Sequence, residues 1–348
     1  MYQNINFIKI IEDAWHDYDS TRSIKAVEDI SAKVSTNHVY RIRFEDDDNI
    51  IAKLSYFGKF EHFEEDHGII NALANNLSAP FENFLAKSLT KHGKLFIYRH
   101  TDSLMDAWVV FYNPIKIDQK PDKKQSKEQI TILGKELAKF HKACYKVANT
   151  LPPNYKQTTD DINHLLEILK TERGQFEHRG HEDVIRKQCD LYIENCDKIG
   201  VAEMPSIPVF VDWNIGNFSV KNDYSFFSRW DYDWFRMSTR MMDFYFFSRV
   251  CSEIGDRTVF SYTIDPLMED RFMIFLKAYH KVYPLTEQEV KILKETYRFF
   301  ILNYVIKDGR YFFHEFYASK LQFEAYDNYF PNIDQSFDTD KILKALDI

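Results

Sequence analysis

The amino-acid sequence predicts an α+β protein of two unequal parts: a small part built on an antiparallel sheet with one main helix, and a larger, mostly helical part. Short apolar segments and an acidic turn occur before residue 60 and indicate strands. Long segments with apolar residues at helical spacing dominate after residue 127. The 348 residues are enough for two such parts, each with its own core.

The first part of the chain predicts one leading helix and three strands. In residues 4–16, Ile8, Ile11 and Trp15 fall on one helical face, which indicates a short helix packed on that side. The acidic residues 45–49 separate two apolar segments and indicate a tight turn. The predicted strands span residues 23–30, 39–44 and 50–54.

Lys53 is a cation within an otherwise apolar strand. Burial of a lysine ammonium costs several kcal/mol unless the charge is paired. An anionic ligand together with a carboxylate partner would explain the position of Lys53, and a lysine on an edge strand that faces solvent is the simpler alternative.

Two further helices and a polar loop follow. Residues 60–77 predict a helix whose buried face carries Phe63, Ile69, Ile70 and Leu73. Residues 114–128 are polar and rich in lysine, which is typical of a solvated loop. Residues 128–147 predict a helix that contains His141, and a core histidine satisfied by hydrogen bonds explains it better than a catalytic role.

The rest of the chain predicts mostly helices. Residues 160–199 are charged and helical, with a break near Arg179 and Gly180. Thr286 and Glu289 form a capping-box pattern at the start of a later helix. The remaining predicted helical segments span residues 240–250, 272–283, 286–304 and 308–330.

The stretch from Pro208 to Asp243 carries the chemistry. An apolar run ends at Asp212, Asn217 follows five residues later, and a second run from residue 224 to Trp230 ends at Asp231. Phosphoryl transfer needs one carboxylate to receive the acceptor's proton, then an amide oxygen and a second carboxylate to hold magnesium. The spacing therefore predicts a kinase-type active site.

This stretch resembles the aminoglycoside phosphotransferase and choline kinase group of small-molecule kinases, which share the two-lobe protein-kinase fold. Their usual pattern is His-Gly-Asp-x-x-x-x-Asn, followed by a strand that ends in Ile-Asp-Trp or Ile-Asp-Phe and by a later Asp. Asp212, Asn217, Asp231 and Asp243 match it in order, and Asp243 lies twelve residues after Asp231. Phe210 and Val211 stand where the group usually has His and Gly, and that His supports the loop without proton chemistry.

The resemblance implies a nucleotide-binding lobe at residues 1–101, with the leading helix, and a catalytic and acceptor-binding lobe at residues 102–348. The linker between the lobes would lie at about residues 98–102, and a helical insertion at about residues 160–199 would help to build the acceptor pocket. The implied roles are as follows: Ser35, Thr36 and Asn37 cover the nucleotide; Lys53 holds its phosphates; Glu65 or Asp66 pairs with Lys53; Asp212 is catalytic; Asn217 and Asp231 hold the metal; Asp243 anchors the loop.

The implied activity is transfer of the γ-phosphoryl group of ATP (or GTP), with Mg²⁺, to a hydroxyl of a small molecule, either cationic or neutral. Aminoglycosides, choline or ethanolamine, and homoserine-like acceptors all fit the group. Aromatic residues near the site, with Asp233 among them, would form either a cage for an amine or ordinary core packing. A nucleotide-binding pseudokinase that acts as a binding or regulatory module is the alternative. The aromatic residues are Trp213, Trp230, Tyr232, Trp234 and Phe235.

Composition excludes several other classes. The 45 basic and 53 acidic residues give a formal charge of -8, which argues against nucleic acid as a partner. The four cysteines form no C-x-x-C pair and no metal-binding spacing, as expected of reduced thiols in a cytoplasmic protein. The N-terminus does not predict a secretory signal, and no apolar run is long enough to predict a membrane span.

Overall fold

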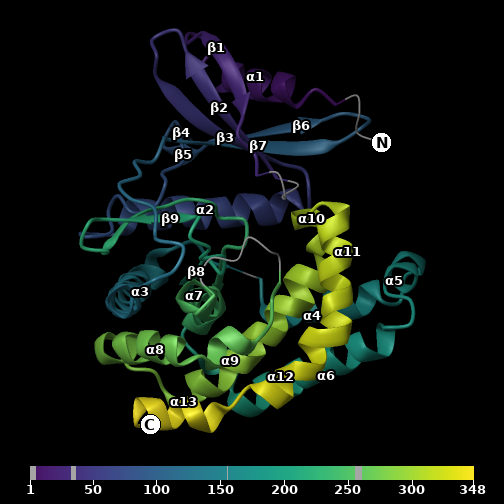
Figure 1. Ribbon diagram of the computed structural model, residues 1–348. Helices are drawn as coiled ribbons and strands as arrows, with labels where there is room; N and C mark the ends of the chain where they lie inside the picture. The colour runs from purple at the N-terminus through teal and green to yellow at the C-terminus, as the bar shows by residue number, and fades with distance from the viewer. Residues whose placement is uncertain (1–4, 33–36, 155, 255–260) are drawn as a thin grey trace.

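The computed structural model describes residues 5–32, 37–154, 156–254 and 261–348. A small lobe that contains a twisted sheet lies above a larger helical lobe, and the C-terminus lies at the far end of the helical lobe (Figure 1). Each lobe has its own cluster of buried apolar residues. The predicted α+β class with a small sheet lobe and a large helical lobe is therefore confirmed.

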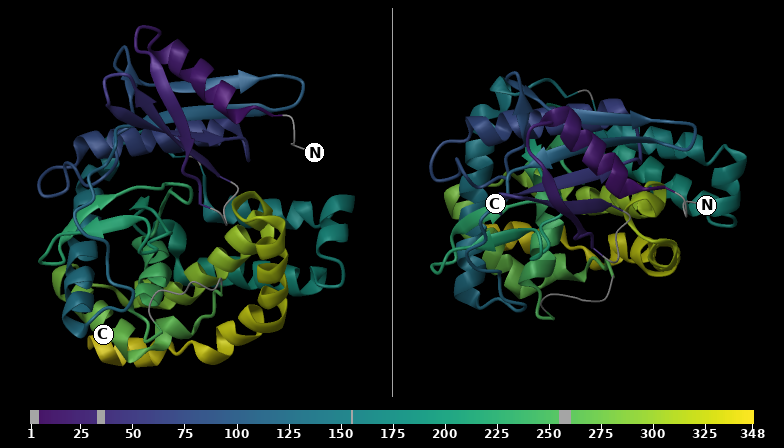
Figure 2. Two further views of the ribbon diagram at one scale, coloured as in Figure 1. Left: turned by 45° about the horizontal axis from the view of Figure 1, so that its top comes forward. Right: turned by 90° about the horizontal axis from the view of Figure 1, so that it is seen from above.

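The small lobe is a five-stranded antiparallel sheet in the order β1-β2-β3-β7-β6. Helix α1 packs its buried face, with Ile11 and Trp15, on the core of this lobe. Helix α2 lies beneath the sheet, between the two lobes (Figure 2). The elements are α1 (Phe7–Tyr18), β1 (Ile24–Asp29), β2 (His38–Phe44), β3 (Asn49–Ser55), α2 (Phe60–Asn76), β4 (Thr90–Lys91), β5 (Lys94–Leu95), β6 (Ile97–Thr101) and β7 (Asp106–Tyr112).

Strand β7 corrects the predicted position of the linker. It pairs with both β3 and β6, so the chain leaves the sheet only after Tyr112. Residues 98–102 belong to β6 and to the turn before β7, and the predicted boundary at residues 101/102 falls within this hairpin. The run from Ala107 to Tyr112 is apolar and buried on both faces, a pattern that strand recognition by alternation misses.

In its described residues, the large lobe is mostly helical and contains four short strands. Its elements are α3 (Lys127–Val147), η1 (Ala148–Thr150), α4 (Thr158–Ile168), α5 (Glu172–Glu177), α6 (Glu182–Ile199), η2 (Val201–Glu203), β8 (Ile207–Val209), β9 (Phe218–Val220), β10 (Phe226–Arg229), β11 (Arg236–Ser238), η3 (Arg240–Asp243), α7 (Phe244–Cys251), η4 (Asp265–Met268), α8 (Asp270–Val282), α9 (Glu287–Phe300), η5 (Ile301–Lys307), α10 (Gly309–Phe312), α11 (Glu315–Glu324), η6 (Ala325–Tyr329), α12 (Phe330–Ser336) and α13 (Thr339–Leu346).

Local signals set several of these boundaries. Thr286 and Glu289 form the predicted capping box at the start of α9. Gly180 has a φ of 82° and lies in the turn between α5 and α6, where the break was predicted. A Cβ atom at Gly134 would lie 2.5 Å from the carbonyl oxygen of Phe275, so the close approach of α3 and α8 requires glycine there.

No helix in the described part of the chain is both long and apolar enough to cross a membrane.

Candidate active site

A cleft of about 480 Å³ lies between the sheet of the small lobe and the loops of the large lobe. Its walls come from β2, β3, the segment after β7 and the two loops of the Pro208–Asp243 stretch. Lys53, Asn217, Asp231 and Asp233 are among its polar lining residues. The segment of residues 113–117, just after β7, lines the side of the cleft where the chain passes between the lobes.

Two pairs of short strands bring the predicted catalytic residues together. Strand β8 pairs with β11, and β9 pairs with β10, both antiparallel. Asp212 and Asn217 lie in the loop between β8 and β9, while Asp231 and Asp233 lie in the loop between β10 and β11. The two pairings therefore hold both loops beside each other.

Asp212 is held at the turn of its loop. Its Oδ1 accepts hydrogen bonds from the backbone N–H of Asn214 at 3.2 Å and from Asn214 Nδ2 at 2.6 Å. Burial, followed by the negative charge of Asp231, raises the pKa of Asp212 to about 6. Asn214 was not among the predicted site residues, although an Asp followed two residues later by Asn is a turn pattern in which the second side chain can reach back.

Val211 has a φ of 60° and lies where the resemblance places glycine. A β-branched residue in this left-handed region is strained, so the surrounding contacts must hold the loop in shape. Asp243 supplies them: its Oδ1 accepts the backbone N–H of Phe210 at 2.8 Å and that of Val211 at 2.7 Å. The predicted anchoring role of Asp243 is confirmed.

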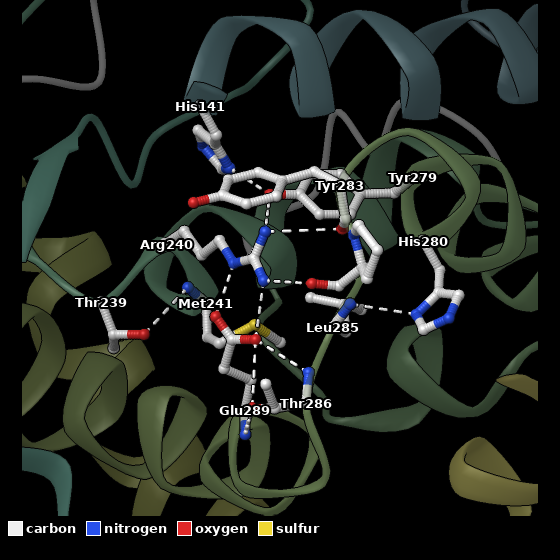
Figure 3. A network of polar contacts seen from close by, with 11 residues as sticks. His141, Thr239, Arg240, Met241, Tyr279, His280, Tyr283, Leu285, Thr286 and Glu289 are labelled. Atoms are coloured by element: carbon white, nitrogen blue, oxygen red, sulfur yellow. Dashed lines mark hydrogen bonds and ion pairs between the residues drawn. The ribbon is translucent and has the colours of Figure 1, made fainter. Parts of the chain in front are cut away.

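The anchor is itself buried in a polar network. His141 Nε2 lies 3.0 Å from Asp243 Oδ2, and His141 Nδ1 lies 2.8 Å from the Tyr279 hydroxyl. Burial lowers the pKa of His141, although Asp243 opposes this shift. Figure 3 shows His141 above Arg240, whose guanidinium lies between the Tyr283 ring and Glu289. The prediction that His141 is a hydrogen-bonded core residue is confirmed.

Lys53 contacts the loop between β10 and β11. Its Nζ lies 3.4 Å from Asp231 Oδ1 and also contacts Asp233 Oδ1. Only 8% of the Lys53 side chain is exposed, compared with 41% of the Asp231 side chain. Burial opposes the charge on Lys53, but Asp233 and Asp231 together raise its pKa above the ordinary value. The expected need of a carboxylate partner for Lys53 is confirmed, and the alternative of a solvent-facing lysine is wrong.

One of the two predicted helix carboxylates, Asp66, pairs with a lysine other than Lys53. Asp66 forms an ion pair with Lys156, which follows α3 in the chain. Burial raises the pKa of Asp66 to about 6 although the Lys156 charge opposes it. The structure thus pairs Asp66 with Lys156, while the carboxylates it places at Lys53 are those of Asp231 and Asp233. The roles of Asp66 and Glu65 in nucleotide binding stay predictions.

The predicted nucleotide-covering loop is described only at its end. Ser35 and Thr36 lie outside the described residues. Asn37 lines the cleft, and its Nδ2 donates a hydrogen bond to Asp233 Oδ2. Asp233, whose role the sequence left open, therefore contacts both Lys53 and Asn37.

The residues at the predicted metal site suit a magnesium ion. Asn217 Nδ2 donates to the backbone carbonyl of Asp212 at 3.3 Å, which leaves the amide oxygen as the atom for a cation. Asp231 has a φ of 66° and contributes its carboxylate to the same cleft. In the described residues, no three His, Cys, Asp or Glu side chains form a metal-binding cluster. One amide oxygen and one carboxylate suffice, however, because magnesium sites of this kind take their other ligands from phosphates and water.

A smaller cavity of about 190 Å³ adjoins the cleft on the side of Asp212. Trp234, Tyr262, Phe312 and Phe313 form its apolar wall, and Asp212, Asn217, Asp231 and Asp233 lie on its polar side. The predicted aromatic cluster divides between two roles. Trp213 and Phe235 are buried core residues, whereas Trp230 and Tyr232 line the larger cleft and Trp234 lines the smaller cavity.

Comparison with protein-family models finds no match to this chain, and comparison with curated protein sequences finds none. Solved structures do match. The amicoumacin kinase hAmiN, in complex with AMP-PNP, Ca²⁺ and Ami, has a TM-score of 0.62 at 12% identity and covers 96% of this chain and 99% of its own. A microcompartment-associated aminopropanol kinase has a TM-score of 0.57 at 14% identity, with 91% and 94% covered. The spectinomycin phosphotransferase APH(9)-Ia, in complex with ADP and spectinomycin, has a TM-score of 0.54 at 14% identity, with 97% and 100% covered. The chain therefore has the fold of aminoglycoside phosphotransferases and related small-molecule kinases.

The Asp243 anchor predicts a large loss of stability on truncation. Asp243→Ala removes two backbone hydrogen bonds and one of the two partners of His141 from a fully buried position. We expect the free energy of unfolding in urea to fall by about 3 kcal/mol. Asp270→Ala is the control, because that side chain is 95% exposed and its ion pair with Lys341 contributes little. Equal stabilities of the two variants would contradict the anchoring role.

The raised pKa of Asp66 predicts a pH-dependent difference between wild type and Asp66→Asn. The folded state holds the Asp66 proton up to about pH 6, whereas an unfolded aspartate releases it near pH ~3.9. Wild type therefore gains stability relative to Asp66→Asn as the pH falls from 7 to 4, by about 2 kcal/mol. Urea unfolding at several pH values measures this. Lys156→Met should move the change to higher pH, since Lys156 opposes the shift; parallel pH profiles of wild type and Asp66→Asn would refute the burial argument.

Proposed function

We propose that this protein is a small-molecule kinase, which transfers the γ-phosphoryl group of ATP or GTP to a hydroxyl of a small acceptor. One observation carries the proposal. The 480 Å³ cleft and the 190 Å³ cavity share the lining residues Asn37, Asn217, Asp231 and Asp233. Asp212 lines the smaller cavity but not the larger cleft. A nucleotide in the cleft and an acceptor in the cavity would meet at the proposed metal ligands, with Asp212 on the acceptor side.

The residues would divide the chemistry as follows. Asp212 would orient the acceptor hydroxyl and take its proton while the acceptor oxygen bonds to the γ-phosphorus. The bond from that phosphorus to the β–γ bridging oxygen breaks, and the nucleoside diphosphate leaves. Lys53 would hold the phosphate oxygens and offset part of their charge. Asn217 and Asp231 would hold Mg²⁺, which supplies positive charge to the phosphates when bound.

The segment after β7 suits the nucleotide base. Asn113 uses its backbone N–H in a hydrogen bond to Lys87, and Pro114 has no N–H. Ile115 is therefore the first residue after β7 whose backbone N–H is available to a base edge. Backbone recognition of this kind does not by itself separate ATP from GTP.

The smaller cavity supports a cationic acceptor. Aromatic side chains line one side and carboxylates the other, and both attract an amine or ammonium group. Aminoglycosides, choline or ethanolamine, and homoserine-like molecules are thus the first acceptors to test. The formal charge of -8 on the chain favours the approach of such cations.

The alternative function is a module that binds nucleotide without turnover. The observation in its favour is the strained φ of Val211, next to Asp212. Binding and turnover measured on the same preparation separate the two functions.

The proposed metal site predicts how Mg²⁺ affects nucleotide binding. Mg²⁺ should increase the thermal shift that ATP produces in wild type, because tighter binding stabilises the folded state by mass action. Asp231→Ala should remove this increase, since it removes the carboxylate ligand. Asp223→Ala, in the exposed turn before β10, is the control and should behave as wild type. A wild type that neither ATP nor GTP stabilises, with or without Mg²⁺, would refute the proposed function.

The proposed role of Asp212 predicts a loss of turnover without a loss of binding. Asp212→Asn keeps the size of the side chain but cannot accept the hydroxyl proton, so kcat should fall by about 10²–10⁴-fold. The Kd for ATP with Mg²⁺ should stay near the wild-type value, because Asp212 lies in the acceptor cavity. Steady-state kinetics with the best acceptor of the panel, and calorimetry for ATP, measure both. An unchanged kcat would assign the proton transfer to another group.

A further inference from the structure

Arg229 is a buried cation beside the loop between β8 and β9 (the catalytic loop), which carries Asp212 and Asn217. It is the last residue of β10, and none of its side chain is exposed. Its backbone N–H donates to the Phe84 carbonyl at 2.6 Å, and its own carbonyl accepts from the Ala86 N–H at 3.1 Å. These contacts on both sides of the backbone fix the position from which the side chain extends.

The guanidinium contacts both ends of the catalytic loop. Nη2 donates to the backbone carbonyl of Asp212 at 3.0 Å, and Nη1 lies 3.5 Å from that of Asn217. The central carbon lies 4.6 Å from the Phe210 ring centre and 4.4 Å from the Trp213 ring centre. A planar, forked group between two aromatic rings can make such a bridge, whereas a lysine ammonium offers only a point charge.

The charge of Arg229 is not explained by an ion pair. The other buried arginines of the described residues, Arg236, Arg240 and Arg298, each have a carboxylate within 4.0 Å. Arg229 has none among the described residues, and its Nε is buried without a hydrogen-bond partner. A buried cation without an ion pair lowers the stability of the fold. Folding alone therefore does not explain the arginine, and its contacts with the loop indicate a function there.

Phe210 makes this bridge more important. Its side chain packs over the guanidinium but offers no hydrogen bond to the loop. Asp243 holds the start of the loop through the N–H groups of Phe210 and Val211. Asp212 and Asn217 must keep a set distance during transfer, and the Asn217 side chain already donates to the Asp212 carbonyl at 3.3 Å. Arg229 adds a second link between these two residues, from a separate strand.

We propose that Arg229 is a positioning residue of the active site, whose guanidinium bridges the carbonyls of Asp212 and Asn217 and so sets the catalytic carboxylate relative to the metal-binding amide. This inference rests on the proposed kinase function. Arg229 touches neither reacting group directly and acts through the backbone of the two residues that do.

The test compares Arg229→Met and Arg229→Lys with Arg271→Met. Arg271 is a matched control, because its guanidinium also donates to two backbone carbonyls, of Cys251 and Gln125, away from the cleft. For each variant, calorimetry measures the Kd for ATP in EDTA and in Mg²⁺, and kcat is measured with Mg²⁺ and ATP, with water as the phosphoryl acceptor. Amide hydrogen exchange of residues 212–217 is measured without nucleotide.

We expect Arg229→Met to lower kcat by about 100-fold, the effect of a misplaced catalytic group. The Kd in EDTA should be unchanged, and the gain in affinity from Mg²⁺ should shrink, because Asn217 is displaced. Arg229→Lys keeps the charge but loses the two-pronged guanidinium, so its kcat should also be lower than that of wild type. This variant provides the test if Arg229→Met fails to fold. Arg271→Met should keep both kcat and the gain from Mg²⁺, whatever it loses in stability.

Wild-type kcat and a wild-type gain from Mg²⁺ in either folded Arg229 variant would overturn the inference. Failure of the proposed function looks different: wild type itself would then show neither a gain from Mg²⁺ nor turnover. In that case the exchange experiment still decides the bridge. Faster exchange of residues 212–217 in the Arg229 variants, but not in Arg271→Met, supports it, and equal exchange refutes it.

Discussion

The carboxylate of Asp243 is the group on which the rest of the site depends. It accepts two consecutive backbone N–H groups, those of Phe210 and Val211, inside a fully buried environment. Val211 is held at a positive φ, and strain of this kind persists only where neighbouring contacts determine the backbone. The Asp212 side chain owes its direction to this turn, since it is the next residue in the chain.

The anchor is stable because its own neighbours are satisfied. His141, from α3, contacts the second oxygen of Asp243 and the hydroxyl of Tyr279, from α8. Those two helices approach closely at Gly134, where a Cβ would collide with the Phe275 carbonyl. Arg240 and Glu289 extend the network toward α9. The loop that carries Asp212 is thus tied to the packed helices α3 and α8 of the helical lobe.

The other side of the site is organised by charge. The buried ammonium group of Lys53 contacts two carboxylates, those of Asp231 and Asp233, from the loop after β10. The remaining negative charge, with Asp212 nearby, is compatible with the divalent cation and the cationic acceptor that we propose. This arrangement also joins the lobes, because Lys53 belongs to the sheet and its partners belong to the helical lobe.

Much of the fold could be predicted because short-range sequence patterns indicate its elements. The first three strands, the α2 helix, the α9 capping box and the break at Gly180 follow from alternation, helical spacing and turn chemistry. Strand β7 could not be recognised in this way, because a strand buried on both faces has no alternation. The missed strand displaced the predicted linker toward the N-terminus.

The sequence by itself determined the order and chemical types of Lys53, Asp212, Asn217, Asp231 and Asp243, because each type and each spacing is a local property of the chain. Asp212, Asn217 and Asp231 also flank the ends of short strands, which local patterns indicate. Tertiary structure decided which charges meet. It paired Lys53 with Asp231 and Asp233, and it paired Asp66 with Lys156. It also buried Arg229 against the backbone of Asp212. The physical reason is that ion pairing and burial depend on distances between segments far apart in the chain, which no spacing along the sequence encodes.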